Sequence, residues 1–109
     1  MIRVLVVDDH ELVRSGITRM LADNPDIEVI GQAPSGEDAI DFVRQERPDI
    51  VLMDIRMPGI GGLEATRRIL RIDDSIRVIV VTACADDPYP TRVMQSGATA
   101  YITKGADIK

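Results

Sequence analysis

Short runs of apolar and β-branched residues alternate with stretches of helical periodicity along this chain of 109 residues. Runs of this kind are typical of strands that are buried on both faces of a parallel sheet. The last run is the most polar, so we expect it at an edge of the sheet. The expected strands cover residues 4–7, 28–33, 50–53, 78–81 and 98–103.

Apolar residues at helical spacing predict one helix after each of the first four strands. Ser35 has the chemistry of an N-cap for the second helix, which Pro48 closes. Gly97 suits the position that follows the last turn of the fourth helix. The expected helices cover residues 12–21 (ending near Asn24 and Pro25), the stretch between Ser35 and Pro48, residues 63–70 and residues 90–96.

The alternation of strand and helix predicts a single α/β domain with a doubly wound, five-stranded parallel sheet and right-handed crossovers. The sequence stops at Lys109, soon after the fifth strand. We therefore expect the domain's fifth, C-terminal helix to be missing, so that residues 1–109 form a domain cut before its last helix. The uncovered apolar surface should then cause association between copies of the chain.

Composition excludes several classes of function. The net charge is −5, and an acidic surface repels nucleic-acid phosphates. The single cysteine, Cys84, can form neither a disulfide framework nor a thiolate metal site. No cleavable leader and no apolar stretch of about 20 residues is evident. We expect a cytoplasmic protein that does not enter the membrane.

Chemically active side chains follow four of the expected strands. Asp8 and Asp9 follow the first, Asp54 the third, Thr82 the fourth and Lys104 the fifth. Ligands of open α/β sheets bind outside the carboxyl ends of the strands, so these residues should converge. Three neighbouring carboxylates favour a hard divalent cation such as Mg²⁺, and an aspartate can form an aspartyl phosphate. A metal ion and an ammonium group would neutralise the phosphoryl oxygens.

Four of these residues also have a simpler explanation. Asp9 could cap the first helix, Asp54 could be a turn residue, and Lys104 could be a solvated surface charge. Thr82 could be an ordinary strand-end residue. Their joint placement favours the functional reading, because chance convergence at consecutive strand ends is improbable. We leave His10 out of the site, since a lone histidine after a strand is more often partly solvated than catalytic.

The sequence resembles receiver domains of bacterial response regulators along essentially its whole length. Within that family it is most similar to the NarL/FixJ subfamily and there to GacA-type global regulators. The resemblance implies a flavodoxin-like sheet with strand order 2-1-3-4-5. The segments that carry the resemblance are residues 6–10, 52–59, 81–83 and 97–104.

The resemblance implies a role for each matching residue. Asp54 would accept a phosphoryl group from a histidine kinase or a phosphotransfer domain. Asp9 and Asp54 would bind Mg²⁺ directly, with the backbone carbonyl of Arg56, and Asp8 would act through water. Lys104 and Thr82 would contact the phosphoryl group. Tyr101 would change rotamer with Thr82, although it could equally be a plain edge-strand aromatic.

Two residues depart from the family pattern. Gly105 follows Lys104 where the family usually has a proline with a cis peptide bond, and a cis bond without proline costs about 2.5–4 kcal/mol. The placement of the lysine is therefore open. Gly61 stands where many receivers have an aspartate that caps the third helix, so we expect a looser loop beside the site.

Beyond this domain, the resemblance implies a C-terminal helix-turn-helix domain through which the whole protein would bind DNA, and a homodimer or swapped association. The domain would catalyse only its own phosphotransfer and dephosphorylation. The main alternative is a pseudo-receiver that is not phosphorylated and acts as a protein-interaction module. An aspartyl phosphatase is disfavoured by Arg56, where a second acid would be needed. A flavin-binding domain is disfavoured by the acidic strand ends.

Overall fold

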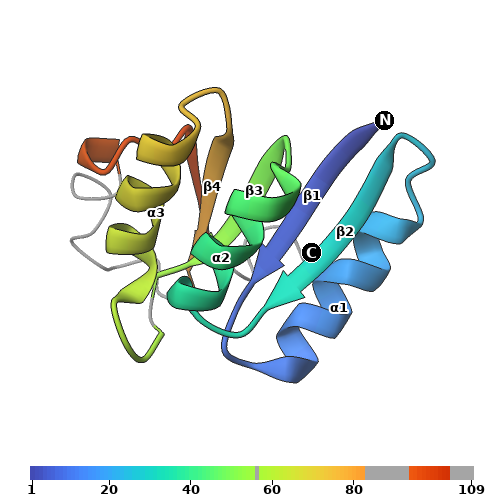
Figure 1. The fold of residues 1–109 in the computed structure, drawn as a ribbon. Helices are drawn as coiled ribbons and strands as arrows, with labels where there is room; N and C mark the ends of the chain where they lie inside the picture. The colour runs from blue at the N-terminus through green and yellow to red at the C-terminus, as the bar shows by residue number, and fades with distance from the viewer. Residues whose placement is uncertain (56, 83–93, 104–109) are drawn as a thin grey trace.

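The computed structural model describes residues 1–55, 57–82 and 94–103, which form a five-stranded sheet (Figure 1). The order is β2-β1-β3-β4-β5 and every pair of neighbours is parallel. This confirms the predicted doubly wound arrangement, including the edge position of the last strand. The strands are β1 (Ile2–Val7), β2 (Ile27–Ala33), β3 (Ile50–Asp54), β4 (Arg77–Thr82) and β5 (Ala100–Thr103).

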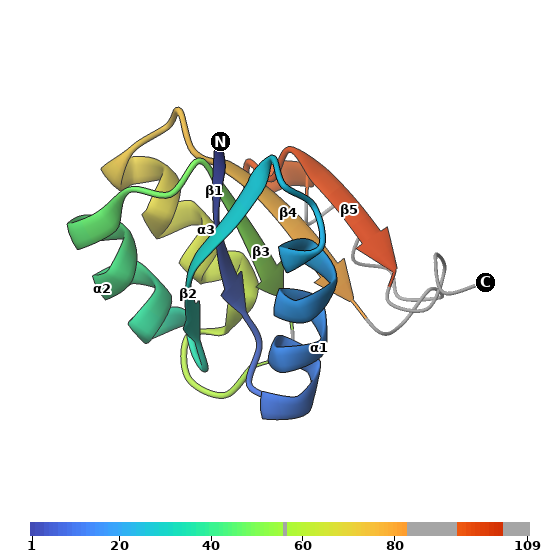
Figure 2. The same cartoon turned by 90° about the vertical axis from the view of Figure 1, so that its right-hand side faces the viewer.

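Among the described residues, three helices cover the two faces of the sheet unequally. Helices α2 (Gly36–Glu46) and α3 (Gly61–Ile72) pack side by side on one face, and α1 (Glu11–Ala22) lies on the other (Figures 1 and 2). The first four residues of the predicted fourth helix, 90–93, lie outside the described residues. Met94 and Gln95 are helical, and Gly97 has a φ of 100°, as its predicted position after the last turn requires.

The core lies between the sheet and the pair α2–α3. Leu5, Met53 and Val80 are fully buried strand residues, and α2 and α3 each contribute four buried residues. Helix α1 contributes none, although its sequence has an apolar stripe. Leu12 and Met20 on α1 are largely exposed. Within the described part of the chain, the α1 face is therefore the less completely covered of the two.

Local chemistry explains where the helices begin and end. The Ser35 hydroxyl accepts a hydrogen bond of 3.1 Å from the Asp38 backbone N–H, which confirms the predicted N-cap of α2. That helix ends at Glu46, because Arg47 adopts a left-handed conformation before Pro48. The N-cap residue of helix α3 is Ile60, which makes no side-chain capping hydrogen bond, and Gly61 is the first residue of the helix. The looser loop expected beside the site stays a prediction.

The strands differ from the prediction only at their ends. Strand β2 begins at Ile27, and its pairing with β1 shifts after Val4, which leaves Ile30 without a Cα partner. Strand β5 begins at Ala100 and not at Ala98. Just before it, the Thr99 N–H donates a hydrogen bond to the Val78 carbonyl of β4. These differences leave the carboxyl ends of the strands where the sequence predicts them.

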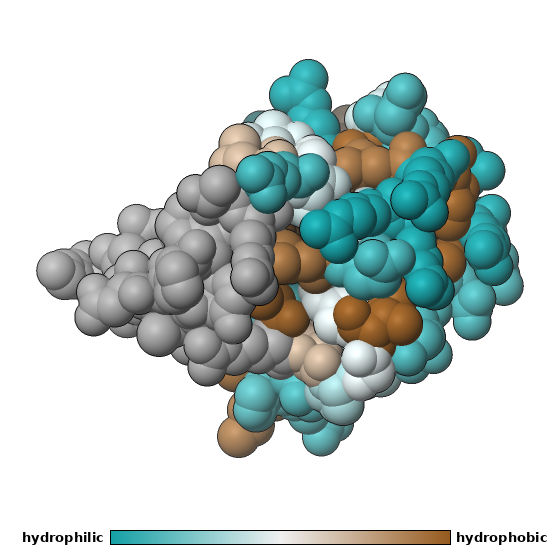
Figure 3. Space-filling model, turned by 90° about the vertical axis from the view of Figure 1, so that its left-hand side faces the viewer, coloured by the Kyte–Doolittle hydropathy of each residue, from teal (hydrophilic) through white to brown (hydrophobic). Residues whose placement is uncertain are grey.

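The surface of the described residues is mixed. Figure 3 shows apolar side chains in brown as patches among polar side chains in teal on one face of the molecule. Among the described helices, none has the length and apolar character that crossing a membrane requires.

Candidate functional site

The turn after β1 fixes Asp8 firmly. Asp8 is only 1% exposed, and its backbone N–H donates a hydrogen bond of 3.1 Å to the Ala33 carbonyl. Its Oδ1 accepts a hydrogen bond of 2.9 Å from the His10 N–H, and its carbonyl accepts one of 2.7 Å from Arg14 on α1. Asp8 is therefore held at the end of β1 by contacts with β2, with its own turn and with α1.

Asp9 and His10 form the outer side of this turn. The side chain of Asp9 is 28% exposed, and that of His10 is 67% exposed. The imidazole Nδ1 of His10 lies 3.0 Å from Asp9 Oδ1 and 3.2 Å from Asp8 Oδ1. The N-cap residue of α1 is His10, so the alternative in which Asp9 caps that helix is wrong.

Asp54 is the last residue of β3 and is 6% exposed. Its backbone pairs in register with Val81 of β4. The start of α3 closes against it: the Gly62 N–H donates to the Ile55 carbonyl at 3.0 Å, and a Cβ at Gly62 would overlap the carbonyl oxygen of Asp54. Asp54 is thus an acid built into the end of a central strand, and the alternative of a simple turn residue does not describe it.

These residues converge on one point. Asp8, Asp9, His10 and Asp54 can each direct a ligand atom so that all four atoms lie within 4.8 Å of one another. Parallel strands β1 and β3 are hydrogen-bonded neighbours whose arrowheads reach the same edge of the sheet (Figure 2). Three of the four ligand atoms are carboxylate oxygens, which are the donors that hard divalent cations prefer. The donor set therefore fits a divalent cation.

The sequence predicted the three acids of this cluster but left out His10. The signal for His10 was its position directly after two aspartates, where a turn of only a few residues must bring its ring close to both carboxylates. That proximity was discounted because a single histidine has no periodicity or spacing to support it.

The other predicted site residues are only partly described. Thr82 ends β4 and follows Val81, the partner of Asp54, but its side chain lies outside the described residues. Tyr101 lies in β5 and pairs in register with Val80, but its side chain lies outside the described residues. Arg56 and Lys104, with the Lys104–Gly105 bond, also lie outside them. The roles expected of these residues therefore stay predictions.

Comparisons with known proteins identify the family. The response regulator receiver domain matches residues 4–109. The chain is 62% identical to the response regulator GacA of Pseudomonas aeruginosa over its whole length, which corresponds to 51% of that relative. The chain thus spans about half the length of the curated relatives that it matches.

Solved structures have the same fold. A two-component response regulator of the LuxR family from Aurantimonas sp. SI85-9A1 aligns with a TM-score of 0.91 and 36% identity, over 96% of this chain and 75% of that one. The CheY of a CheX-CheY-BeF3-Mg complex from Borrelia burgdorferi aligns with a TM-score of 0.89 and 28% identity, over 97% and 80%. Fold, acidic strand ends and sequence similarity agree, and the chain belongs to the response regulator receiver domains.

Proposed function

We propose that Asp54 is the phosphoacceptor of this receiver domain. The observation that carries the proposal is the convergence of a buried Asp54 with Asp8 and Asp9 at the carboxyl ends of two neighbouring strands. A carboxylate in this position can attack a phosphoryl group that enters from the open edge of the sheet.

The residues of the cluster divide into an acceptor and cation ligands. Asp9 and Asp54, with the backbone carbonyl of Arg56, would bind Mg²⁺ directly, and Asp8 would bind it through water. When bound, Mg²⁺ neutralises charge on the phosphoryl oxygens, so that an anionic donor can approach three carboxylates. The Borrelia neighbour was solved with Mg and BeF3, which supports this assignment.

The reaction itself needs only one nucleophile. A carboxylate oxygen of Asp54 forms a bond to phosphorus while the phosphorus–nitrogen bond of a phosphohistidine breaks, and the electron pair leaves on the imidazole nitrogen of the donor. Lys104 would neutralise the transferred group, and the Thr82 hydroxyl would donate a hydrogen bond to one of its oxygens. Tyr101 would follow Thr82 as the second switch residue.

In the whole protein, the partner of this domain would be a sensor histidine kinase or a phosphotransfer domain. Residues 1–109 would be the receiver part of a longer regulator whose C-terminal domain binds DNA, consistent with a match to about half of each curated relative. Phosphorylation would shift the balance between two states of the receiver and change dimer or interdomain contacts.

Intact-mass spectrometry tests the acceptor. The protein is incubated with acetyl phosphate, with and without Mg²⁺, beside Asp54→Asn and the matched variant Asp41→Asn, which removes an exposed carboxylate of α2. We expect one phosphoryl adduct that needs Mg²⁺, persists in Asp41→Asn and is absent from Asp54→Asn. An adduct that survives in Asp54→Asn would assign the acceptor elsewhere. No adduct on a protein with a folded circular dichroism spectrum would favour the pseudo-receiver.

A further inference from the structure

The ring of His10 lies in the acidic cluster, although the turn does not need this side chain for its own hydrogen bonds. Its backbone N–H already closes the turn on Asp8, and its carbonyl accepts the 3.0 Å hydrogen bond from Arg14 N–H that starts α1. The ring is an additional group, and its Nδ1 lies between the carboxylates of Asp8 and Asp9. The backbone of His10 is therefore anchored while its ring faces the cation site.

The spacing of the ligand atoms matches that of two ligands on one ion. In an octahedral site with bonds of about 2.1 Å, neighbouring ligand atoms are separated by about 3.0 Å. The distances from His10 Nδ1 to Asp9 Oδ1 and Asp8 Oδ1 are 3.0 and 3.2 Å.

We propose that His10 is a nitrogen ligand through which the acidic cluster binds first-row transition ions such as Mn²⁺. The inference rests on the proposed function, because the ion would occupy the same site as Mg²⁺. Imidazole is a common ligand of transition ions, whereas Mg²⁺ prefers oxygen ligands. His10 would therefore shift the selectivity of the site away from Mg²⁺ and toward transition ions, with Asp9 and Asp54 supplying oxygen ligands.

The chain is well suited to a direct test, because His10 is its only histidine. Mn²⁺ alone is added to the untagged 109-residue protein, prepared once with ordinary and once with ¹⁵N-labelled histidine, and the complex is studied by pulsed EPR. We expect a nitrogen hyperfine coupling that changes with the label. His10→Asn keeps an N-cap residue on α1 and should lose the coupling.

Affinity gives a second readout that a purely structural role would not produce. Dissociation constants for Mn²⁺ and Mg²⁺ are measured by calorimetry for the wild type and for His10→Asn. The preference for Mn²⁺ over Mg²⁺ should fall about tenfold in the variant, within the range found when groups around a metal site are removed. Glu11→Gln, which removes a neighbouring charge outside the cluster, should leave the preference unchanged.

Asp54→Asn separates the two proposals. Mn²⁺ binding that is weakened by Asp54→Asn and shows the labelled coupling supports His10 as a ligand. Mn²⁺ binding that is weakened by Asp54→Asn without any coupling to the histidine label would overturn the role of His10 and leave the cation site intact. Mn²⁺ binding that does not depend on Asp54, or no binding at all, would overturn both the proposed site and this inference.

Discussion

The acidic residues at the two ends of the sheet have different surroundings. At the carboxyl ends, Asp8, Asp9 and Asp54 are brought within 4.8 Å of one another, and His10 is the basic side chain among the four. At the amino ends, Asp49 and Asp73 lie beside hydrogen-bond donors. Asp49 accepts a hydrogen bond of 2.9 Å from the Arg3 N–H.

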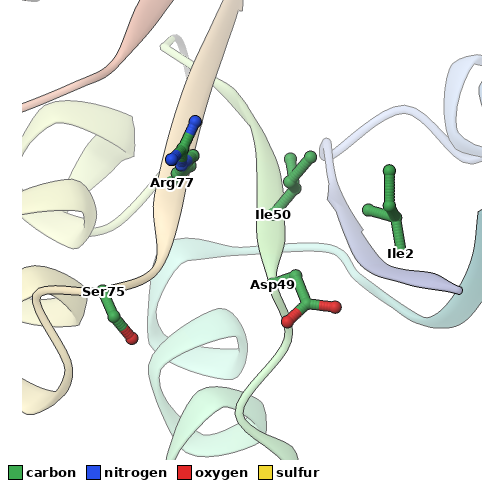
Figure 4. Close-up of a pocket in the computed structure, with 5 residues that line it drawn as sticks. All are labelled: Ile2, Asp49, Ile50, Ser75 and Arg77. Carbon is green, nitrogen blue, oxygen red and sulfur yellow. The ribbon is translucent and has the colours of Figure 1, made fainter.

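The amino end also has a pocket, but its chemistry differs. The pocket has a volume of about 300 Å³ and lies among the starts of β1, β3 and β4 (Figure 4). Its acid, Asp49, belongs to the backbone network there, since its N–H donates to the Arg3 carbonyl and its own carbonyl accepts from Arg77 N–H. The residues that line the pocket are Ile2, Asp49, Ile50, Ser75 and Arg77.

The two ends differ in how the charges of their acids are balanced. Acids at the amino end are satisfied by arginines, a serine and backbone N–H groups, which gives them a structural role. Acids at the carboxyl end lie close together, and a cation would reduce the repulsion between their charges. The carboxyl end, where the acids are crowded, is the one that fits receiver chemistry.

The largest effect should come from the backbone packing behind Asp54. In Gly62→Ala the new methyl group would overlap the Asp54 carbonyl and lie 2.9 Å from the Ile55 Cα, so we expect a loss of about 2–3 kcal/mol in the free energy of unfolding. Gly16→Ala on α1 meets no atom within 4 Å and should gain up to about 1 kcal/mol. Urea denaturation measures both, and equal shifts would contradict the tight packing of the carboxyl end.

Neutralising one acid at each end should change stability with opposite signs. Without divalent ions, Asp9→Asn should raise the free energy of unfolding by about 1 kcal/mol, because it relieves repulsion among neighbouring carboxylates. Asp49→Asn should lower it by about 1 kcal/mol, because it weakens the acceptor of the Arg3 N–H. Thermal and urea unfolding of both variants give the comparison.

Repeating the unfolding experiments with Mg²⁺ tests whether the ion binds at the acidic cluster. At a concentration one hundred times its dissociation constant, an ion that binds only the folded state stabilises it by about 2.7 kcal/mol. Wild type and Asp49→Asn should both show this gain, and Asp9→Asn should show much less. A gain of the same size in all three proteins would place the ion outside the acidic cluster.

The predictability of the two ends from sequence also differs. The parallel sheet and the convergence of Asp8, Asp9 and Asp54 follow from periodicity and from the rule that parallel strands present their carboxyl ends at one edge. The strand order comes from the resemblance to receiver domains. The position of His10 depends on the path of one turn, and the network around Asp49 depends on the ends of three different strands. Neither leaves a periodic signal, and the sequence marks His10 only by its position directly after two aspartates. The sequence likewise does not show that the sheet face under α1 is less completely covered than the face under α2 and α3, because this depends on how the helices pack.

The smallest effect should appear at the amino end, as a dependence of stability on pH. The Ser75 hydroxyl, at 2.6 Å, and the Ser75 N–H, at 3.0 Å, donate to Asp73 and, with Arg47, hold the pKa of that carboxyl below its ordinary value of 3.8. A lowered pKa in the folded state adds stability that is present above the unfolded pKa. This stability is lost as the pH falls below the ordinary value of 3.8 and through the folded pKa.

Ser75→Ala isolates this contribution. It removes the hydroxyl, the largest cause of the lowered pKa, and leaves the N–H in place, so the variant should be slightly less stable than wild type at pH 7. The difference should shrink as the pH falls through the acid range, because protonated Asp73 gains less from the hydroxyl. Ser15→Ala, at an exposed position of α1, should show a difference from wild type that does not change with pH. A constant difference for Ser75→Ala across the acid range would mean that the hydroxyl supports the turn by a contact other than its hydrogen bond to the ionised carboxylate.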